Sequence, residues 1–364
     1  MRQARLGNTG LVVSRVGFGG IPIQRLTESE AAAVVRGCLD LGVTFIDTGS
    51  GYTTSEERIG KAIAGQRDGL VIATKTGASD RAGARAHVEL SLRRLGVDHI
   101  DIYQLHGLSN RERYDLATGP GGAIEALLEA KEQGLIGHVG ASSHSLELAK
   151  EIITSGLFET VQYPFNFIAD ESERELLPLA RERGIGFIAM KPIGGGMIPN
   201  ARLAIRYLAQ FPGVVPDPGI QEVREMAELV AAVEESEGLT AEDRREIEAI
   251  RQELGTRFCH RCDYCQPCTK GISISTVLWG RSSIRRFPLE RVFGESSAAA
   301  FRKALDCAEC GDCELRCPYN LPIREMLKAE TAFYFAERAR YDADPAAYRQ
   351  HHVRRITSSF SSER

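Results

Sequence analysis

The chain has 364 residues, of which 43% are hydrophobic and 26% are charged, so it is long enough for one large domain and a smaller one. Lys and Arg number 45 against 49 for Asp and Glu, and the formal net charge of -4 provides no basic field for nucleic acid or an anionic membrane. The first residues lack an apolar signal core, and no apolar run approaches the roughly 20 residues that span a bilayer. We therefore expect a soluble, cytoplasmic protein without a nucleic-acid or membrane partner.

Short apolar segments alternate with helical patterns through the first two thirds of the chain. Ahead of them, the turn residues Asn8 and Gly10 lie between apolar stretches and predict a hairpin that would plug the bottom of the fold. Thr27 and Glu30 have the capping-box spacing and predict a helix that runs to Leu41. Eight segments are predicted as strands, and they cover residues 14–19, 44–48, 70–75, 100–106, 138–142, 160–165, 186–191 and, more weakly, 213–219.

Eight strands with intervening helices in about 240 residues fit an α/β fold of the (β/α)8 barrel (TIM barrel) type, for which roughly 250 residues is typical. A doubly wound parallel sheet is the alternative. Two amphipathic helices follow over 219–235 and 239–255, and Gly255 is the predicted end of the barrel domain, residues 1–255. The rest divides into a cysteine-containing domain over 256–330 and a C-terminal helix with a polar tail over 331–364.

Four chemically active side chains follow successive predicted strands. They are Asp47 at the end of the second strand, Tyr52 in the loop after it, Lys75 at the end of the third strand and His106 at the end of the fourth. Active sites of this fold lie at the C-terminal strand ends, and a buried Lys there needs a partner such as Asp47. Taken singly, Asp47 could be a helix-cap acid, Tyr52 a surface aromatic and His106 a core histidine, but the four together favour a site.

This set of residues supports the reduction of a carbonyl group. The Tyr52 hydroxyl can donate a proton to the developing alkoxide, and the Lys75 ammonium lowers the tyrosine pKa, ordinarily about 10, by favouring the phenolate. Asp47 would hold Lys75, and His106 could hydrogen-bond the carbonyl oxygen and orient it. The sequence therefore predicts an oxidoreductase that acts on a small-molecule carbonyl or alcohol.

Eight of the nine cysteines lie between Cys259 and Cys317, in two motifs with metal-ligand spacing. The second motif, CAECGDCELRCP, has the CxxCxxCxxxCP pattern of bacterial ferredoxins, whose loop wraps three corners of a 4Fe-4S cluster. The first motif, CHRCDYCQPC, has two residues instead of three before Cys268 and Thr269 instead of Pro. Disulfides would need a secretory route, and structural zinc sites normally separate two CxxC pairs by a longer loop. Cys38 stands alone and is expected to be a buried helix residue.

Several of these segments resemble the aldo-keto reductase family. FIDTGSGYTTSEERIGKAI is similar to the family pattern DTAxxYGxSExxxG, and VIATK and DIYQLH are similar to the strands that carry its catalytic Lys and His. The resemblance covers roughly residues 4–235. It implies a (β/α)8 fold, hydride transfer from NADPH or NADH, and a catalytic set of Asp47, Tyr52, Lys75 and His106.

The same resemblance implies a set of cofactor-binding residues. Met190 stands where the family usually has a Tyr that stacks on the nicotinamide ring. Glu225 stands where the family has an Arg for the 2′-phosphate, which favours NADH, but Arg224 is adjacent, so the choice between NAD and NADP stays open. The residues implied to bind the cofactor are Ser142, Ser143 and Gln162 at the nicotinamide end, Gly194, Gly195 and Gly196 near the pyrophosphate, Glu228 near the adenosine, and also Gly20, Met190 and Lys191.

The cysteine module resembles the 4Fe-4S dicluster extension of a subgroup of aldo-keto reductases, and two-cluster ferredoxins use the fourth Cys of each motif for the other cluster. This implies two 4Fe-4S clusters, one on Cys259, Cys262, Cys265 and Cys317 and the other on Cys268, Cys307, Cys310 and Cys313. Three functions stay open. They are a carbonyl reductase or alcohol dehydrogenase whose clusters shape the substrate mouth or dock a partner, an enzyme that passes electrons through the clusters between substrate and an external ferredoxin or flavoprotein, and a non-catalytic redox sensor or subunit.

Overall fold

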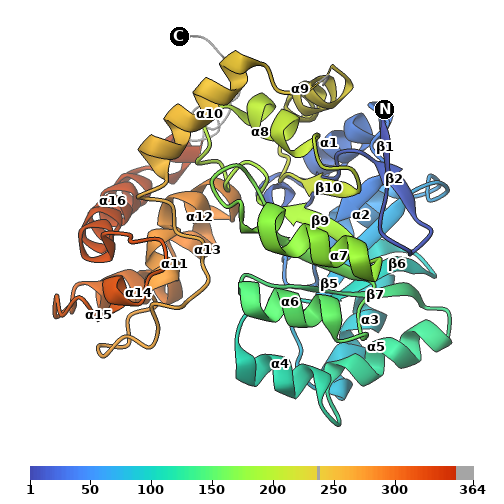
Figure 1. The fold of residues 1–364 in the computed structure, drawn as a ribbon, viewed down its shortest axis with the longest axis horizontal. Coiled ribbons are helices and arrows are strands. Elements are labelled where there is room, and N and C mark those ends of the chain that lie inside the picture. The colour runs from blue at the N-terminus through green and yellow to red at the C-terminus, as the bar shows by residue number, and fades with distance from the viewer. Residues whose placement is uncertain (236–237, 350–364) are drawn as a thin grey trace. The chain divides into compact units, whose positions relative to one another are not determined.

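The protein divides into two compact units. The structure is a computed structural model that describes residues 1–235 and 238–349 (Figure 1). The first unit combines Met1–Ile193 with Arg202–Thr240, and the second combines Gly194–Ala201 with the chain from Ala241 onward. All strands in the described ranges belong to the first unit and both cysteine motifs belong to the second, so the two predicted chemistries lie in separate units.

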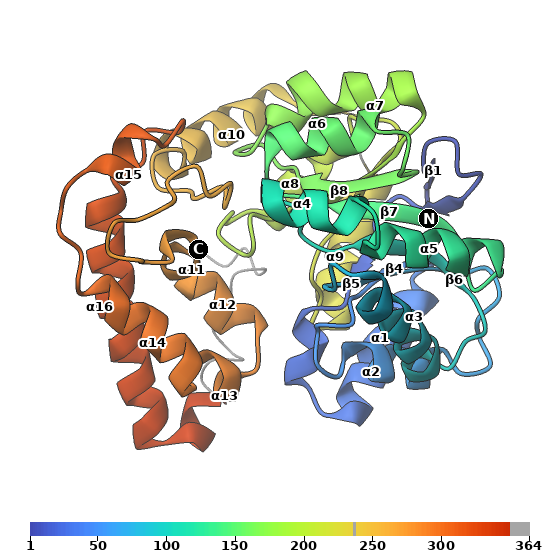
Figure 2. The same cartoon turned by 90° about the horizontal axis from the view of Figure 1, so that it is seen from below.

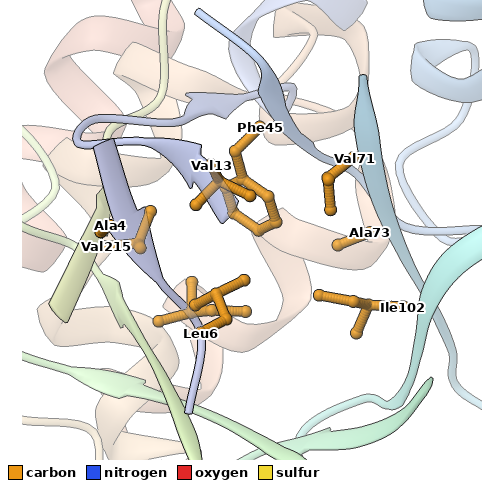
Figure 3. Packing of buried hydrophobic residues seen from close by; sticks show 9 residues of the cluster. Ala4, Leu6, Val13, Phe45, Val71, Ala73, Ile102 and Val215 are labelled. Atoms are coloured by element: carbon orange, nitrogen blue, oxygen red, sulfur yellow. The ribbon is translucent and has the colours of Figure 1, made fainter. Parts of the chain in front are cut away.

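A short hairpin opens the first unit. Strand β1 (Gln3–Arg5) pairs antiparallel with β2 (Val12–Ser14), as the turn residues between them predict. The side chains of Leu6 and Val13 are fully buried among residues at the beginnings of the barrel strands, in a cluster with Ala4, Phe45, Val71, Ala73, Ile102, Ile188 and Val215 (Figure 3). The apolar side of the hairpin therefore closes one end of the barrel.

Eight parallel strands form the barrel of the first unit (Figure 1). Each strand pairs with the next one in sequence order. Gly19 N donates to Pro218 O at 2.8 Å, and Gly19 forms a parallel bridge with Gly219, so the first barrel strand also meets the last. This nearly closed ring confirms the predicted (β/α)8 barrel over a doubly wound sheet. The strands are β3 (Phe18–Gly19), β4 (Phe45–Asp47), β5 (Val71–Thr76), β6 (Ile100–Leu105), β7 (Ile136–Ser142), β8 (Thr160–Pro164), β9 (Gly186–Met190) and β10 (Val214–Asp217).

Helices connect the strands, and their beginnings follow the capping rules. Thr27 Oγ1 accepts from Glu30 N at 3.3 Å and Glu30 Oε2 accepts from Thr27 N at 2.8 Å, which is the predicted capping box. The helices are α1 (Glu28–Asp40), α2 (Ser55–Ile63), α3 (Arg81–Leu95), α4 (Arg111–Thr118), α5 (Ala123–Glu132), α6 (Leu146–Thr154), α7 (Leu177–Arg183), α8 (Ala201–Leu208) and α9 (Val223–Glu234), with shorter helical turns at Pro22–Arg25 and Ser172–Leu176.

The described part of the second unit consists of helices and loops (Figure 2). Its longest helix, α16 (Ile323–Ala343), is centred on Tyr334, whose ring stacks on Phe301 at 3.7 Å and whose hydroxyl donates to Val292 O at 2.9 Å. The predicted polar tail lies outside the described residues from position 350 onward. No helix in the two described ranges is both long and apolar enough to cross a membrane. The other helices are α10 (Ala241–Leu254), α11 (Ile274–Leu278), α12 (Gly280–Arg286), α13 (Leu289–Val292), α14 (Glu295–Ala304) and α15 (Asp312–Leu315).

Candidate active site and cluster pockets

A buried ion pair lies at the C-terminal ends of the barrel strands. Lys75 on β5 places its Nζ against Asp47 Oδ1 at the end of β4, and Nζ also donates to Thr48 O at 2.6 Å. Burial lowers the pKa of Lys75, but the neighbouring groups, foremost the Asp47 carboxylate, together outweigh burial and the net shift is upward. Lys75 is therefore held as an ammonium ion inside the barrel mouth.

Tyr52 and His106 lie beside this ion pair. The Lys75 Nζ is 5.5 Å from the centroid of the Tyr52 ring. The Tyr52 and His106 rings meet edge to face, with centroids 5.6 Å apart and an angle of 79° between their planes. The backbone fixes both residues, because Tyr52 N donates to Gly49 O and His106 N donates to Thr76 O, each at 2.9 Å. The structure thus brings all four predicted catalytic residues together.

Asp217, which is not among the residues predicted from the sequence, lies in the same site. It ends β10, is 8% exposed, and accepts at Oδ2 from Gln162 Nε2 at 2.9 Å. Burial and then the nearby Asp47 carboxylate raise the pKa of Asp217 well above its ordinary value. The signal that could have found Asp217 is its position, because it ends a barrel strand just as Asp47 and Lys75 do.

The three residues that are predicted to bind the nicotinamide differ in the hydrogen bonds that they already make within the protein. Ser142 Oγ accepts from Gly107 N at 2.8 Å, which leaves its own proton for a ligand. Gln162 is the register partner of Ser142 across β7 and β8, and its buried Oε1 has no hydrogen-bond partner among the described residues. Ser143 Oγ accepts from Ser145 N at 3.0 Å and donates to a backbone carbonyl, so it holds the loop ahead of α6. Ser142 and Gln162 therefore offer a donor and an acceptor side by side.

Gly20, Met190 and Lys191 lie at other strand ends. A Cβ on Gly20 would lie 2.7 Å from Ser55 Oγ, so a residue without a side chain lets the start of α2 approach β3. Met190 ends β9 and is partly exposed. Lys191 has a φ of 53°, and its Nζ lies 3.1 Å from His144 Nε2. Gly20 thus has a packing function, whereas Lys191 presents a polar group.

The predicted pyrophosphate loop belongs to the second unit. Gly194, Gly195 and Gly196 have φ angles of 56°, 67° and 87°, which favour glycine. Gly195 O accepts from Ser282 Oγ at 2.9 Å, and a Cβ on Gly195 would lie 2.5 Å from the Trp279 ring. The run is therefore packed against α12 and the residue before it, and these contacts alone account for its glycines.

A carboxylate occupies the N-terminus of α9. Glu225, 2% exposed, accepts from Gln221 N at 2.7 Å and from Glu222 N at 3.0 Å, and burial raises its pKa. Arg224 pairs with Glu222 at 2.5 Å. Glu228, one turn later, is partly buried, and burial raises its pKa as well. Two amides directly before the start of α9 are thus already used by an acid of the chain.

The eight clustered cysteines line two separate hollows of the second unit. Each hollow takes three cysteines from one motif and one from the other, which is the grouping that the resemblance to two-cluster ferredoxins implies. Within residues 1–235 and 238–349, no three His, Cys, Asp or Glu side chains converge on a site for a single metal ion. One hollow is lined by Cys259, Cys262, Cys265 and Cys317, and the other by Cys268, Cys307, Cys310 and Cys313.

Neighbouring side chains hold the cysteine loops in place. Arg316 Nη2 donates to Cys265 O at 3.0 Å and to Pro267 O at 2.9 Å, which ties the second motif to the first. Trp279 Nε1 donates to Cys259 O at 2.8 Å. Burial raises the pKa of Cys265 to about 12, so metal binding has to displace a proton from this thiol.

Known protein families match both parts of the chain. The aldo/keto reductase family matches residues 15–211, and the 4Fe-4S dicluster domain matches residues 258–322. The uncharacterized oxidoreductase YqkF of Bacillus subtilis (strain 168) is 30% identical over 217 residues, which are 56% of this chain and 68% of that relative.

Solved structures are similar to the barrel. Aldo-keto reductase AKR11C1 from Bacillus halodurans, in its holo form, has a TM-score of 0.59 at 26% identity and covers 69% of this chain and 96% of its own. An aldo-keto reductase from Klebsiella pneumoniae in complex with NADPH has a TM-score of 0.59 at 22% identity, covers 69% and 95%, and shows the fold alone. These matches show that the chain belongs to the aldo/keto reductase family and that a 4Fe-4S dicluster domain follows its barrel in the sequence.

Proposed function

We propose that this protein is a cytoplasmic NAD(P)H-dependent oxidoreductase that interconverts a carbonyl and an alcohol by hydride transfer. The observation that carries the proposal is the buried Lys75–Asp47 pair with the Tyr52 ring 5.5 Å from the ammonium. A Tyr hydroxyl beside a fixed ammonium can give up its proton, because the cation stabilises the negative charge that remains. The small-molecule substrate would lie over these residues at the C-terminal strand ends.

Each residue of the site then has one task. Tyr52 donates its hydroxyl proton to the carbonyl oxygen, and the Lys75 ammonium stabilises the phenolate left behind. Asp47 holds Lys75, and His106 orients the carbonyl oxygen. A bound nicotinamide supplies the hydride. Ser142 Oγ would donate to its carboxamide oxygen and Gln162 Oε1 would accept from its carboxamide N–H.

The choice of nicotinamide cofactor follows from the start of α9. Glu225 accepts from the amides of Gln221 and Glu222, so a 2′-phosphate placed there would meet a carboxylate. The adjacent Arg224 is already paired with Glu222. These contacts favour NADH over NADPH in the proposal.

The two cysteine hollows favour a second candidate function, in which electrons pass between the substrate and an external ferredoxin or flavoprotein. Four thiols around each hollow are the donor set of a 4Fe-4S cluster, and the two hollows would hold two clusters. Hydride transfer moves two electrons together, whereas a cluster takes one at a time, so this route needs a flavin or a similar converter from the partner. Electron paramagnetic resonance tests it, because cluster reduction by substrate or partner supports the route and its absence with every partner excludes it.

Anaerobic purification with iron and sulfide counting, followed by NADH and NADPH titration over a panel of carbonyls, tests the main proposal. We expect turnover with wild type and a loss of about 100-fold to 10,000-fold in Tyr52→Phe, because the proton donor is removed. Tyr103→Phe is the matched control, since the buried Tyr103 hydroxyl bonds Ser91 Oγ at 3.1 Å and lies outside the site. Unchanged turnover in Tyr52→Phe contradicts the proposal, whereas unchanged biological activity of Tyr52→Phe favours a non-catalytic sensor.

A further inference from the structure

Two buried carboxyl groups share one ammonium ion at the barrel mouth. Asp47 uses Oδ1 for Lys75, and Asp217 uses Oδ2 to accept from Gln162 Nε2 at 2.9 Å. The two other oxygens, Asp47 Oδ2 and Asp217 Oδ1, are buried and have no hydrogen-bond donor among the described residues. Unsatisfied buried acceptors are costly, and a single proton between the two acids would satisfy both.

The charge balance leads to the same arrangement. The charged groups that act on Asp217 are Asp47 from β4 and Lys75 from β5, while β8 contributes the neutral Gln162 and β3 contributes the backbone of Gly19. Two carboxylates and one ammonium would leave a net negative charge in a buried site. Burial and the nearby Asp47 carboxylate together raise the pKa of Asp217.

We propose that Asp217 is a neutral positioning residue, whose carboxyl proton is donated to Asp47 Oδ2 and whose carbonyl oxygen accepts from Gln162 Nε2. The first bond fixes Asp47 so that Oδ1 faces Lys75. The second bond fixes the Gln162 amide, so that Oε1 and not Nε2 points to the N–H of a nicotinamide carboxamide. The role rests on the proposed hydride-transfer function, and Asp217 acts on it through Asp47 and Gln162.

Two substitutions of similar size separate this role from simple packing. In Asp217→Asn, the amide Nδ2 can donate to Asp47 Oδ2 and Oδ1 can accept from Gln162 Nε2, which reproduces both bonds of the neutral acid. In Asp217→Leu neither bond can form, and the buried polar atoms of Asp47 and Gln162 are left without partners. Denaturation curves of both variants show whether they fold.

Infrared difference spectroscopy on the full-length protein with its clusters, at pH 7, tests whether the Asp217 carboxyl group is protonated. The spectrum of wild type minus Asp217→Asn is expected to contain the carbonyl stretch of a protonated carboxylic acid. Asp101→Asn is the matched control, because Asp101 pairs with Arg67 at 2.5 Å and accepts from Ile72 N at 2.7 Å. Its difference spectrum is expected to contain carboxylate bands and no band of a protonated carboxylic acid. Carboxylate bands for Asp217 overturn the proposal, whether or not the protein transfers hydride.

Steady-state kinetics test the positioning. Asp217→Asn is expected to lower kcat/KM for carbonyl reduction by no more than about 10-fold, and Asp217→Leu to lower it by at least about 100-fold with a higher KM for the nicotinamide cofactor. Equal losses of kcat/KM in the two folded variants overturn the positioning role. If Asp217→Leu does not fold, either carboxylate bands for Asp217 in the infrared spectrum or a loss above about 10-fold in Asp217→Asn overturns it. Full activity in Tyr52→Phe would instead contradict the hydride-transfer function and leave the infrared result standing.

Discussion

At the scale of single residues, the Lys75 ammonium is the charge on which the rest of the site depends. Lys75 and Asp47 are 2% and 3% exposed, so neither can be solvated if the other is removed. A buried ion pair adds little net stability, but the loss of one member leaves an unpaired charge in a low-dielectric surrounding. The same pair therefore has a large effect on stability when it is broken and a large effect on the chemistry of Tyr52.

We expect Lys75→Met to lower the free energy of unfolding by about 3–5 kcal/mol, because Asp47 loses its counter-charge. Lys61→Met is the matched control, since Lys61 pairs with Glu28 where the side chains are 58% and 60% exposed, and its expected change is within about 1 kcal/mol. Urea denaturation followed by circular dichroism measures both. Similar small losses in the two variants would contradict a dependence on burial.

How far the sequence predicts the site differs between residues. Asp47 and Lys75 can be nominated because a polar side chain at the end of a buried strand needs a reason to be there. Asp217 also ends a strand, but Pro216 and Pro218 flank it, and prolines are typical of loops and edge strands. Its segment is therefore the weakest strand prediction, and Asp217 is recognised as a site residue only from the closed barrel of the structure.

At the scale of secondary structure, Glu159 ties three elements together at the start of β8. Its carboxylate binds Lys131 Nζ from α5 at 2.5 Å, His138 Nδ1 from β7 at 2.6 Å and the backbone N of Val139 at 3.2 Å. Partial burial opposes ionisation, but the bonds from His138 and Lys131 prevail and lower the pKa of Glu159 to about 2. A carboxyl group with a lowered pKa stabilises the fold above its unfolded pKa and loses this effect as the pH falls toward the folded value.

Glu159→Gln is therefore expected to cost about 1–2 kcal/mol at pH 7, a figure that allows for the partial exposure of the site. The difference from wild type should shrink below about pH 4.5 and vanish only below about pH 2, where wild-type Glu159 is protonated as well. Urea denaturation at several pH values measures the difference. Glu175→Gln, which loses a partly exposed pair with the single cation Lys150, should show a smaller effect. A constant difference in stability between Glu159→Gln and wild type at all pH values would contradict the linkage.

Elements are predicted well where a periodic pattern decides them and poorly where it does not. The barrel strand in LVIATK contains the nearly continuous apolar run LVIAT, and the helix after Thr27 begins with a capping box, so both can be located from the sequence. Between the two cysteine motifs the helices are short, from α13 with four residues to α14 with ten, and none is predicted. A helix of one or two turns offers too few positions for a period to be read.

At the scale of the whole molecule, two chemistries belong to two compact units. The sequence indicates this division because eight cysteines gather between Cys259 and Cys317, away from the barrel strands. The boundary is harder to read. Gly255 has the features of a helix end, whereas the internal contacts group α10 with the second unit from Ala241 onward, and the predicted boundary at residue 255 stays a prediction. The periodicity of a helix tells where its apolar face lies but not which unit covers that face.

Pairs of cysteine variants test which thiols share a cluster. Cys268 and Cys310 line the same hollow, although they come from different motifs. Each of Cys268→Ser and Cys310→Ser is therefore expected to lose roughly half of the bound iron, and the double variant no more than either alone. Cys265→Ser combined with Cys310→Ser is expected to lose nearly all of it, because Cys265 lines the other hollow. Iron and sulfide counting after anaerobic purification measures each loss.

Cys38→Ser is the control for these variants, because Cys38 is buried in α1, where burial raises its pKa to about 12, and it should leave the iron content unchanged. The opposite pairing, in which Cys265 and Cys268 behave as the redundant pair, would contradict the crossed arrangement and assign each motif to its own cluster. Both arrangements use the same eight thiols and bind the same total iron. Single variants therefore cannot distinguish them, and only the pattern of combined losses shows which thiols meet at one cluster.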